Sequence, residues 1–324
     1  MKIPRRKFLH LAAGAAGLSA TSHSARAQVY PVRPVRIIVA FAPGSAPDII
    51  ARIMGQWLSE RLGQQFLVEN KPGAAGNIGA EAAANAPPDG YTLLQVPTAF
   101  AINASIYDKL GFNLVRDIAP IGSIFHNSNV MEVQPSFPAQ TVPEFIAYAK
   151  ANPQKINFGS GGVGTTLHVA GELFKMMTGI NMVHVPYRGV AAVSGLLGGD
   201  VQVMFDNMPT SIEHIRAGRL HPLAVTTTTR SEVLPDVPTI NEVVPGYEVR
   251  TWFGVGAPKN TPVKIIEKLN REINAGLADP QMQAKYANMG GTVFPGSISD
   301  FSKLIASETE KWAKVVKFAG IKAE

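Results

Sequence analysis

Residues 157–177, NFGSGGVGTTLHVAGELFKMM, contain the residue types from which proteins build anion sites. Four glycines fall within residues 159–164, after a short β-like segment and before two threonines. The apolar residues that follow are spaced like one face of a helix: Leu167, Ala170, Leu173, Phe174 and Met177. Glycines let backbone N–H groups approach a ligand, and a helix N-terminus adds unpaired donors and a positive dipole end. The stretch predicts an anion site, with a purely structural turn as the alternative.

Three familiar motifs match this turn incompletely. Gly159 to Gly164 fits G-x-G-x-x-G, but the next predicted strand, residues 182–185, lacks the acid that holds a ribose. The spacing also fits a P-loop, yet Thr165 stands where the phosphate-binding lysine is needed. A nucleophile elbow requires glycine where Phe158 stands. The anion is therefore unlike those of the nucleotide motifs.

A second stretch of the same kind lies upstream. Residues 35–41 form an apolar run typical of a buried parallel strand, and the small-residue loop 42–48 follows it. Pro47 and Asp48 suit the first turn of the next helix. One loop alone offers too few contacts, since a charge-assisted hydrogen bond nets about 1.5–3 kcal/mol. A micromolar complex needs about 8 kcal/mol, so two such loops acting together would suit a small anion better than one.

Composition restricts the class of protein. The chain has 324 residues, 46% of them hydrophobic, which is enough for two domains. Its formal charge of +6 is concentrated at the start, because five of 30 basic residues and no acidic ones lie in residues 1–27. The remaining chain is almost neutral, so nucleic acid is not an expected partner. Without cysteine, thiolate metal sites and cysteine nucleophiles are excluded.

Residues 1–27 have the pattern of a cleavable signal peptide. Arg5, Arg6 and Lys7 form a charged region of twin-arginine type, and a short Ala/Gly-rich apolar run follows. Ala25-Arg26-Ala27 is an A-x-A cleavage signal. The pattern predicts export to the periplasm by either the twin-arginine or the general secretory route, the alternative being a basic tail on a cytoplasmic protein.

Strands and helices alternate along the rest of the chain, which predicts an α/β fold with mainly parallel sheets. Thr141 is expected to cap a helix with Glu144 at its third position. Thr261 is expected to cap another, with proline at the first position. Residues 121–133 read as an extended segment that crosses between domains. Asn103 faces either a cleft or its own local surroundings and solvent, with a slight preference for the second.

Seven stretches together resemble one family, the solute-binding receptors of tripartite tricarboxylate transporters, or Bug family. They are FAPGSAPDIIAR, NKPGAAGNIGAEAAANAPPDGYTLL, NFGSGGVGTTLHVAGELFK, VHVPYRG, LLGGDVQVMFDN, HIRAGRLHPLAVTTTTRSEVLPDVPT and KWAKVVKFAGIKAE. Each is weak alone, but their order and spacing are specific. The resemblance covers essentially all of the chain after residue 27.

The resemblance implies the fold of a type II periplasmic binding protein, with two α/β domains and a ligand cleft between them. Domain 1 would comprise residues 28–126 and 230–324, and domain 2 residues 127–229. Loops 42–48 and 159–168 would face each other across the cleft. Backbone amides and hydroxyls, rather than an arginine, would hold the ligand's carboxylate.

The resemblance and the loop chemistry together predict the ligand-binding residues. They are Phe41, Ala42, Gly44, Ser45, Ala46, Asp48, Thr98, Gly161, Gly162, Gly164, Thr165, Thr166, His168, Tyr187, Arg188 and Asp206.

Several of these residues have a second interpretation. Ser45 replaces a common glycine, and either donates to the ligand or narrows the pocket. Asp48 is expected to cap its helix or bind loop amides rather than face an anion. Arg188 reaches a distal ligand charge or pairs with a surface acid. Tyr187 and Phe41 line the pocket or belong to the core.

The predicted function is capture of a small carboxylate, such as a di- or tricarboxylate, an amino acid or an aromatic acid, for delivery to permease subunits in the membrane. No catalysis, cofactor or metal is expected, and the protein is expected to be a monomer. His168 and His184 are expected to be structural. The alternatives are an exported hydrolase using Ser160 or Thr165 with His168, and a receptor that serves signalling.

Overall fold

The computed structural model describes residues 30–107, 109–188 and 191–322. The predicted signal peptide lies outside these ranges. Residues from Arg33 onward form one body, to which all elements below belong.

The described part of the body contains ten strands: β1 (Val35–Val39), β2 (Phe66–Asn70), β3 (Thr92–Pro97), β4 (Ile118–Val133), β5 (Asn157–Ser160), β6 (Val183–Pro186), β7 (Val203–Asn207), β8 (His221–Val225), β9 (Arg250–Pro258) and β10 (Gly291–Val293). Its helices in the described ranges are α2 (Ala46–Leu62), η2 (Ala74–Gly76), α3 (Asn77–Ala84), α4 (Ala99–Ile106), α5 (Leu114–Asp117), α6 (Val142–Ala151), α7 (Thr166–Thr178), α8 (Ala191–Gly198), α9 (Met208–Arg216), η3 (Ile240–Glu242), α10 (Val263–Leu277), α11 (Pro280–Asn288) and α12 (Ile298–Ala319).

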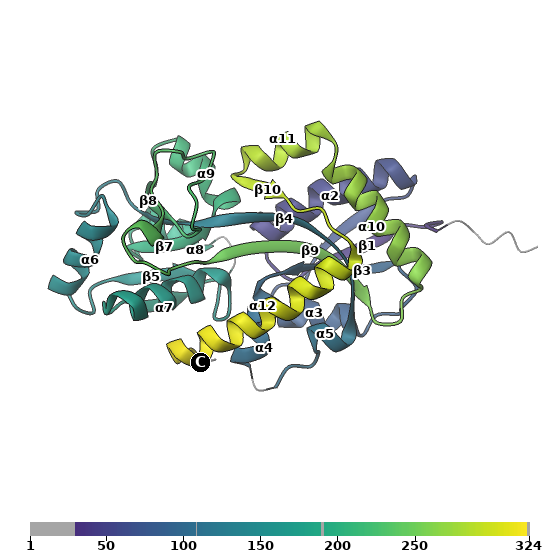
Figure 1. The fold of residues 1–324 in the computed structure, drawn as a ribbon, viewed down its shortest axis with the longest axis horizontal. Helices are drawn as coiled ribbons and strands as arrows, with labels where there is room; N and C mark the ends of the chain where they lie inside the picture. The colour runs from purple at the N-terminus through teal and green to yellow at the C-terminus, as the bar shows by residue number, and fades with distance from the viewer. Residues whose placement is uncertain (1–29, 108, 189–190, 323–324) are drawn as a thin grey trace, which may run out of the picture. The chain divides into compact units, whose positions relative to one another are not determined.

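The strands form two sheets that share β4 (Figure 1). The first sheet has the order β2-β1-β3-β9-β4, with β10 added to β4. The second has the order β4-β7-β5-β6, with β8 also paired to β4. The fold is that of a type II periplasmic binding protein, with an α/β domain around each sheet.

β4 connects the two sheets because its pairing partner changes along its length. From Ile118 to Ser128 it pairs with β9, and from Asn129 to Val133 it pairs with β7. The prediction that residues 121–133 cross between domains agrees with this strand. The change of partner lies near the predicted boundary at residue 127, and the domain limits themselves stay a prediction.

The expected predominance of parallel strands is wrong for the middle of the molecule. β1–β2, β1–β3, β5–β6 and β5–β7 are parallel, as the βα alternation requires. β9, however, runs antiparallel to β3 and β4, and β4 runs antiparallel to β7. A segment that leaves one sheet and a later one that returns must run in opposite directions, so the two long central strands pair antiparallel.

Helix starts follow the local sequence closely. The Thr141 side chain accepts from the Glu144 N–H at the start of α6, as predicted. The predicted Thr261 cap is wrong by one residue, because Pro262 takes the N-cap position of α10. The Thr261 hydroxyl instead donates to the Pro258 carbonyl in the preceding turn.

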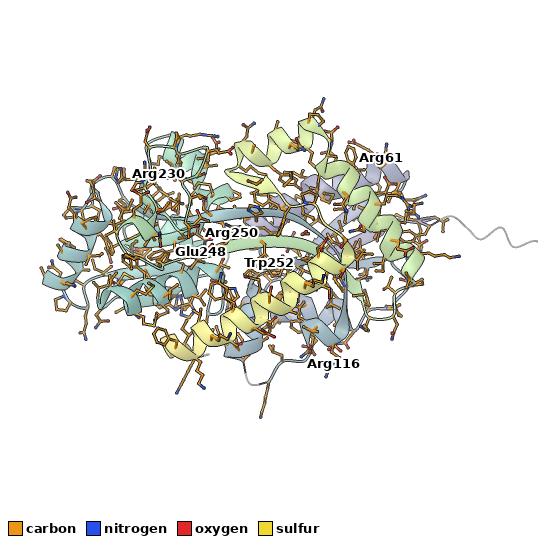
Figure 2. The ribbon with its side chains drawn as sticks, in the orientation of Figure 1. Arg61, Arg116, Arg230, Glu248, Arg250 and Trp252 are labelled. Atoms are coloured by element: carbon orange, nitrogen blue, oxygen red, sulfur yellow. The ribbon has the colours of Figure 1, made fainter. Side chains whose placement is uncertain are left out.

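Arginine charges on this body are compensated locally. Arg61, Arg116, Arg230 and Arg250 lie on different elements in Figure 2, and each forms an ion pair with a nearby glutamate or aspartate. Such exposed pairs add little stability, but they neutralise the surface.

None of the helices in the described ranges combines the length and apolar character needed to cross a bilayer.

Candidate ligand-binding site

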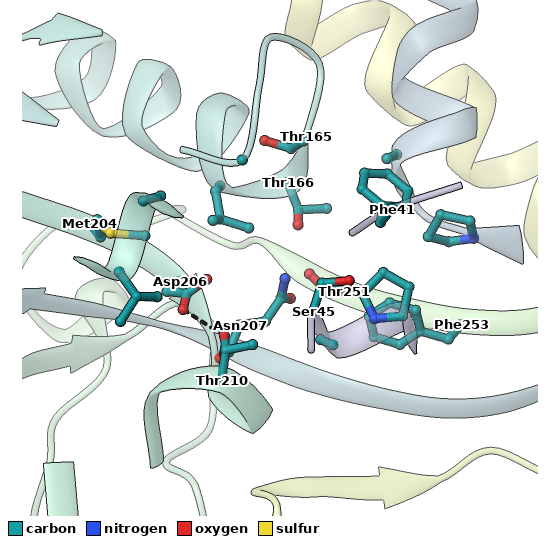
Figure 3. A pocket seen from close by; sticks show the side chains of 18 residues that line it. Phe41, Ser45, Thr165, Thr166, Met204, Asp206, Asn207, Thr210, Thr251 and Phe253 are labelled. Atoms are coloured by element: carbon teal, nitrogen blue, oxygen red, sulfur yellow. Dashed lines mark hydrogen bonds between the residues drawn. The ribbon is translucent and has the colours of Figure 1, made fainter. Parts of the chain in front are cut away.

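A cavity lies between the two sheets and is lined from both (Figure 3). We call it the inner cavity. Its lining residues are Phe41, Ser45, Ala46, Pro47, Pro97, Ala99, Gly161, Thr165, Thr166, Leu167, Ala192, Val193, Met204, Asp206, Asn207, Thr210, Thr251 and Phe253. Loops 42–48 and 159–168 thus meet at one place, although more than a hundred residues separate them.

A second hollow, which we call the outer cavity, shares Phe41 and Gly161 with the inner one. Its lining includes the small-residue segment 72–76 together with Tyr107, Gly162, Tyr187 and Arg188. The two cavities therefore adjoin at the tips of the two loops.

Helix N-termini converge on the inner cavity. Its walls include first-turn residues of α2, α4, α7, α8 and α9. First-turn N–H groups have no intrahelical acceptor, and each helix end carries partial positive charge. Thr166 opens α7, and Figure 3 shows its hydroxyl directed into the cavity. The arrangement suits a small anion.

The predicted residues divide into three groups. Seven of them line the inner cavity: Phe41, Ser45, Ala46, Gly161, Thr165, Thr166 and Asp206. Four others line the outer cavity: Ala42, Gly162, Tyr187 and Arg188. The remaining five line neither cavity: Gly44, Asp48, Thr98, Gly164 and His168.

Loop 42–48 is held in shape by its own polar side chains. The Asp48 carboxylate accepts from the Gly44 N–H at 2.9 Å and also from Arg52 and Asn70. Although burial opposes its ionisation, these hydrogen bonds keep the pKa of Asp48 below its usual value. The Ser45 hydroxyl donates to the Ala42 carbonyl at 2.6 Å, so its proton is directed to the loop.

Thr98 also serves the scaffold. It is fully buried, its hydroxyl donates to the Trp252 carbonyl, and it accepts from the Trp252 N–H at 2.7 Å. β9 thus takes the only proton of this hydroxyl and one of its two acceptor sites, and Thr98 lines neither cavity.

Loop 159–168 is held by neutral side chains. The Ser160 hydroxyl contacts the N–H and the carbonyl of Gly162, at 3.1 and 3.2 Å. Thr165 donates to the Gly162 carbonyl and caps α7 at the His168 N–H. The Gly164 N–H donates to His168 Nδ1 at 3.2 Å. Two of the glycine amides expected to face a ligand are therefore already bonded within the loop.

Two stacked histidines support this loop from behind. The rings of His168 and His184 lie 4.0 Å apart, and Phe158 packs beside both. Burial lowers the pKa of His168 to about 3, helped by His184 and Lys175. Burial and Lys175 lower the pKa of His184 to about 4. Both rings are neutral at pH 7 and fill structural positions.

The hydrolase alternative required Ser160 or Thr165 to pair with His168. Ser160 Oγ instead lies 2.6 Å from His184 Nε2, while His168 is bonded to Gly164. Ser160 is fully buried and lines neither cavity. Among the described residues, His184 Nδ1 has no orienting partner. A neutral His184 protonated on Nε2 satisfies the Ser160 hydroxyl and fixes the Gly162 peptide.

Asn103 belongs to its local surroundings, as the preferred expectation had it, but it does not face solvent. It is fully buried, and its amide donates to the Ala75 carbonyl and to Asn77. A Cβ on Gly164 would clash with Asn103 Oδ1, so α4 and the glycine loop are in close contact here. Tyr107 adds a bond between them, from its hydroxyl to the Val163 carbonyl at 2.9 Å.

Phe41 and Tyr187 were expected either to line the pocket or to belong to the core, and each does both. Phe41 lines both cavities and also stacks on Phe100, with 6.5 Å between ring centroids. Tyr187 lines the outer cavity, while its ring packs against Gly195 of α8. Each therefore belongs partly to the wall and partly to the packing behind it.

Sequence reasoning missed several lining residues. Asn207 ends β7 and Thr210 lies in the first turn of α9, and polar residues where a strand passes into a helix were a usable signal. Thr251 and Phe253 come from β9, and nothing in their local sequence indicates a cavity. Within the described ranges, no cluster of three histidine or acidic side chains is placed to hold a metal.

Comparison with known proteins agrees with this architecture. The family model described as "Tripartite tricarboxylate transporter family receptor" matches residues 50–321. A UPF0065 protein in the tcbD-tcbE intergenic region of Pseudomonas sp. (strain P51) is 38% identical, covering 97% of this chain and 94% of its own. Protein BugT of Bordetella pertussis is 36% identical, and the match covers 91% of this chain and 92% of BugT.

Solved structures show the same relationship. "R. palustris Rpa4515 with adipate" has a TM-score of 0.88 at 37% identity, covering 90% of this chain and 99% of its own. MatC from Rhodopseudomonas palustris with bound malate has a TM-score of 0.85 at 27% identity, covering 89% and 100%. The chain belongs to the tripartite tricarboxylate transporter receptor family, in its Bug branch, and is a solute-binding protein of that family.

Proposed function

We propose that this protein binds a small carboxylate in the inner cavity and delivers it to a tripartite tricarboxylate-type transporter. The observation that carries the proposal is the convergence of helix N-termini from both sheets on one cavity. Relatives with bound adipate and malate support the ligand class. Closure of the two domains about the shared strands brings the two loops onto the ligand.

The partners follow from the family. Permease subunits in the membrane receive the ligand, and residues 1–27 direct the chain to the periplasm by the twin-arginine or the general secretory route. The protein acts as a monomer without catalysis. Binding of a carboxylate should therefore raise the melting temperature without any turnover.

A carboxylate screen by calorimetry tests the proposal, with adipate and malate among the probes. Thr166→Ala should weaken carboxylate binding about 5- to 10-fold, because it removes a hydroxyl at the N-terminus of α7. Thr178→Ala, at the other end of the same helix, is the matched control and should bind normally. Absence of binding to every di-, tri- and monocarboxylate at millimolar concentration would contradict the proposal.

A further inference from the structure

One wall of the inner cavity contains a buried acid, which is unexpected in an anion site. Asp206 is 4% exposed, lies near the end of β7 and lines the cavity beside Asn207. Figure 3 shows one of its carboxyl oxygens bonded to Thr210 and the other on the cavity side. This acid needs an explanation in terms of the ligand.

A second buried carboxyl lies behind the first. Glu132, on β4, is fully buried, and Ser211 Oγ lies 2.8 Å from Glu132 Oε1 and 3.1 Å from Asp206 Oδ2. Among the described residues, neither acid has a basic partner. Two unpaired buried carboxylates this close would repel strongly, so the pair is expected to hold at least one proton.

Hydrogen-bond counting leads to the same conclusion. The Ser211 hydroxyl has one proton and contacts two carboxyl oxygens, so one of those contacts requires a carboxyl proton. The Thr210 hydroxyl contacts Asp206 Oδ2 at 2.5 Å and the Asn207 carbonyl at 2.8 Å, and the carbonyl can only accept. Burial also raises the pKa of Asp206, and burial together with Asp206 raises that of Glu132.

Such a pair leaves Asp206 with an acceptor oxygen on the cavity side. The helix ends around the cavity supply donors for a carboxylate, whereas Asp206, whose carboxyl also accepts from the Asn207 N–H, offers the ligand an acceptor. A second ligand carboxylate at this point would place acceptor against acceptor. A hydroxyl or an ammonium group would satisfy the oxygen.

We propose that Asp206 selects the ligand: it accepts a hydrogen bond from a hydroxyl or ammonium group on the carbon next to the ligand's carboxylate. This inference rests on the proposed function. The preferred ligands are thus 2-hydroxy or 2-amino acids, and the corresponding unsubstituted acids bind more weakly.

Calorimetry with matched triplets of acids tests the inference on the full chain. The triplets are lactate, alanine and propionate; malate, aspartate and succinate; and mandelate, phenylglycine and phenylacetate. In at least one triplet, the hydroxy or amino acid should bind at least 10-fold more tightly than the unsubstituted acid. Preference for the hydroxy member identifies a hydroxyl donor, and preference for the amino member an ammonium donor.

Two variants localise the preference. Asp206→Ala should reduce the preference for the substituted over the unsubstituted acid to less than about 3-fold. Asp206→Asn retains an acceptor and should keep most of a preference for the hydroxy acid. Glu213→Ala removes a solvent-facing acid from the same helix region and should change nothing. Thermal unfolding identifies any variant that does not fold; if Asp206→Ala is one, Asp206→Leu, which also lacks an acceptor but fills a similar volume, replaces it and should reduce the preference in the same way.

The outcomes separate the two proposals. Equal affinity for all members of every triplet that binds would overturn the role of Asp206 and leave carboxylate binding intact. A preference that persists in Asp206→Ala would also overturn it. Failure of every acid to bind would instead contradict the proposed function.

Discussion

The two loops at the cavity are built on the same plan but held by different chemistry. Loop 42–48 depends on an ionised side chain, Asp48, whose partner Arg52 is half-exposed. Loop 159–168 depends on three uncharged side chains: Ser160 and His168, which are buried, and His184, which is partly buried. Both arrangements leave the helix ends facing the cavity while keeping fixed charge away from it.

The two loops illustrate two ways in which a binding protein can hold a loop rigid without placing a fixed charge next to its ligand. In loop 42–48 the negative charge of Asp48 is directed away from the cavity and neutralised by Arg52. In loop 159–168 no charge is needed, because neutral donors and acceptors bond the glycine amides directly. The two loops should therefore respond differently to acid, to backbone change and to loss of single contacts.

Acid should give the largest difference. The folded-state pKa values of about 3 for His168 and about 4 for His184 lie below the unfolded value of 6.5. Their contribution is present above pH 6.5 and is lost as the pH falls, because the unfolded chain binds the protons first. Between pH 7 and pH 5 the contribution of these two histidines to the free energy of unfolding should fall by about 3 kcal/mol, allowing for the partial exposure of His184.

Urea unfolding at both pH values measures this loss. The double variant His168→Gln/His184→Gln should lose much less on acidification than the parent. Asp48→Asn should lose as much as the parent, because the pKa of Asp48 lies below this range. Equal losses in the parent and the double variant would contradict the assignment.

A methyl group on Gly164 should have the next largest effect. Its φ is +89°, which strains any other residue by about 1–2 kcal/mol, and the added Cβ clashes with Asn103. Gly164→Ala should weaken ligand binding about 30- to 100-fold, measured by calorimetry. Gly179→Ala is the matched control, since its φ is +68° and nothing lies within 4 Å.

The control should lose stability but keep its affinity. A Gly164→Ala protein that binds as tightly as Gly179→Ala would show that contact between the glycine loop and α4 does not matter for binding.

Removing Asp48 should destabilise the other loop. Asp48→Ala deletes bonds to Gly44, Arg52 and Asn70 and should lower the free energy of unfolding by about 2 kcal/mol. Arg52→Ala removes only the exposed partner and should cost below about 1 kcal/mol. Chemical denaturation of both variants measures the two decreases in the free energy of unfolding. A larger decrease in Arg52→Ala than in Asp48→Ala would contradict the view that Asp48 holds the loop.

The smallest expected effect is the loss of the Tyr107 hydroxyl. Tyr107→Phe removes one bond to the Val163 carbonyl and should weaken ligand binding about 3- to 5-fold, roughly 1 kcal/mol. Tyr148→Phe, on the remote helix α6, should bind like the parent. Unchanged affinity in Tyr107→Phe would mean that this contact is incidental to closure.

Much of the fold was predictable because its signals are local. The helix starts at Thr141 and Pro47, the small-residue loops and the alternation of strands and helices depend on neighbours in the chain. The antiparallel pairing of β4 and β9 was not predictable, since it depends on where two distant segments cross. The cavity residues Thr251 and Phe253 were missed for the same reason.

The glycine-rich stretch shows the division clearly. Local sequence was enough to predict a strand, a glycine-rich turn and a helix here, and the order of the motifs was enough to indicate the family. Which amides remain available depends on the packing of distant segments, because His184 reaches Ser160 from the neighbouring strand. The same holds for the buried pair of Asp206 and Glu132, since a carboxyl's environment depends on what packs around it.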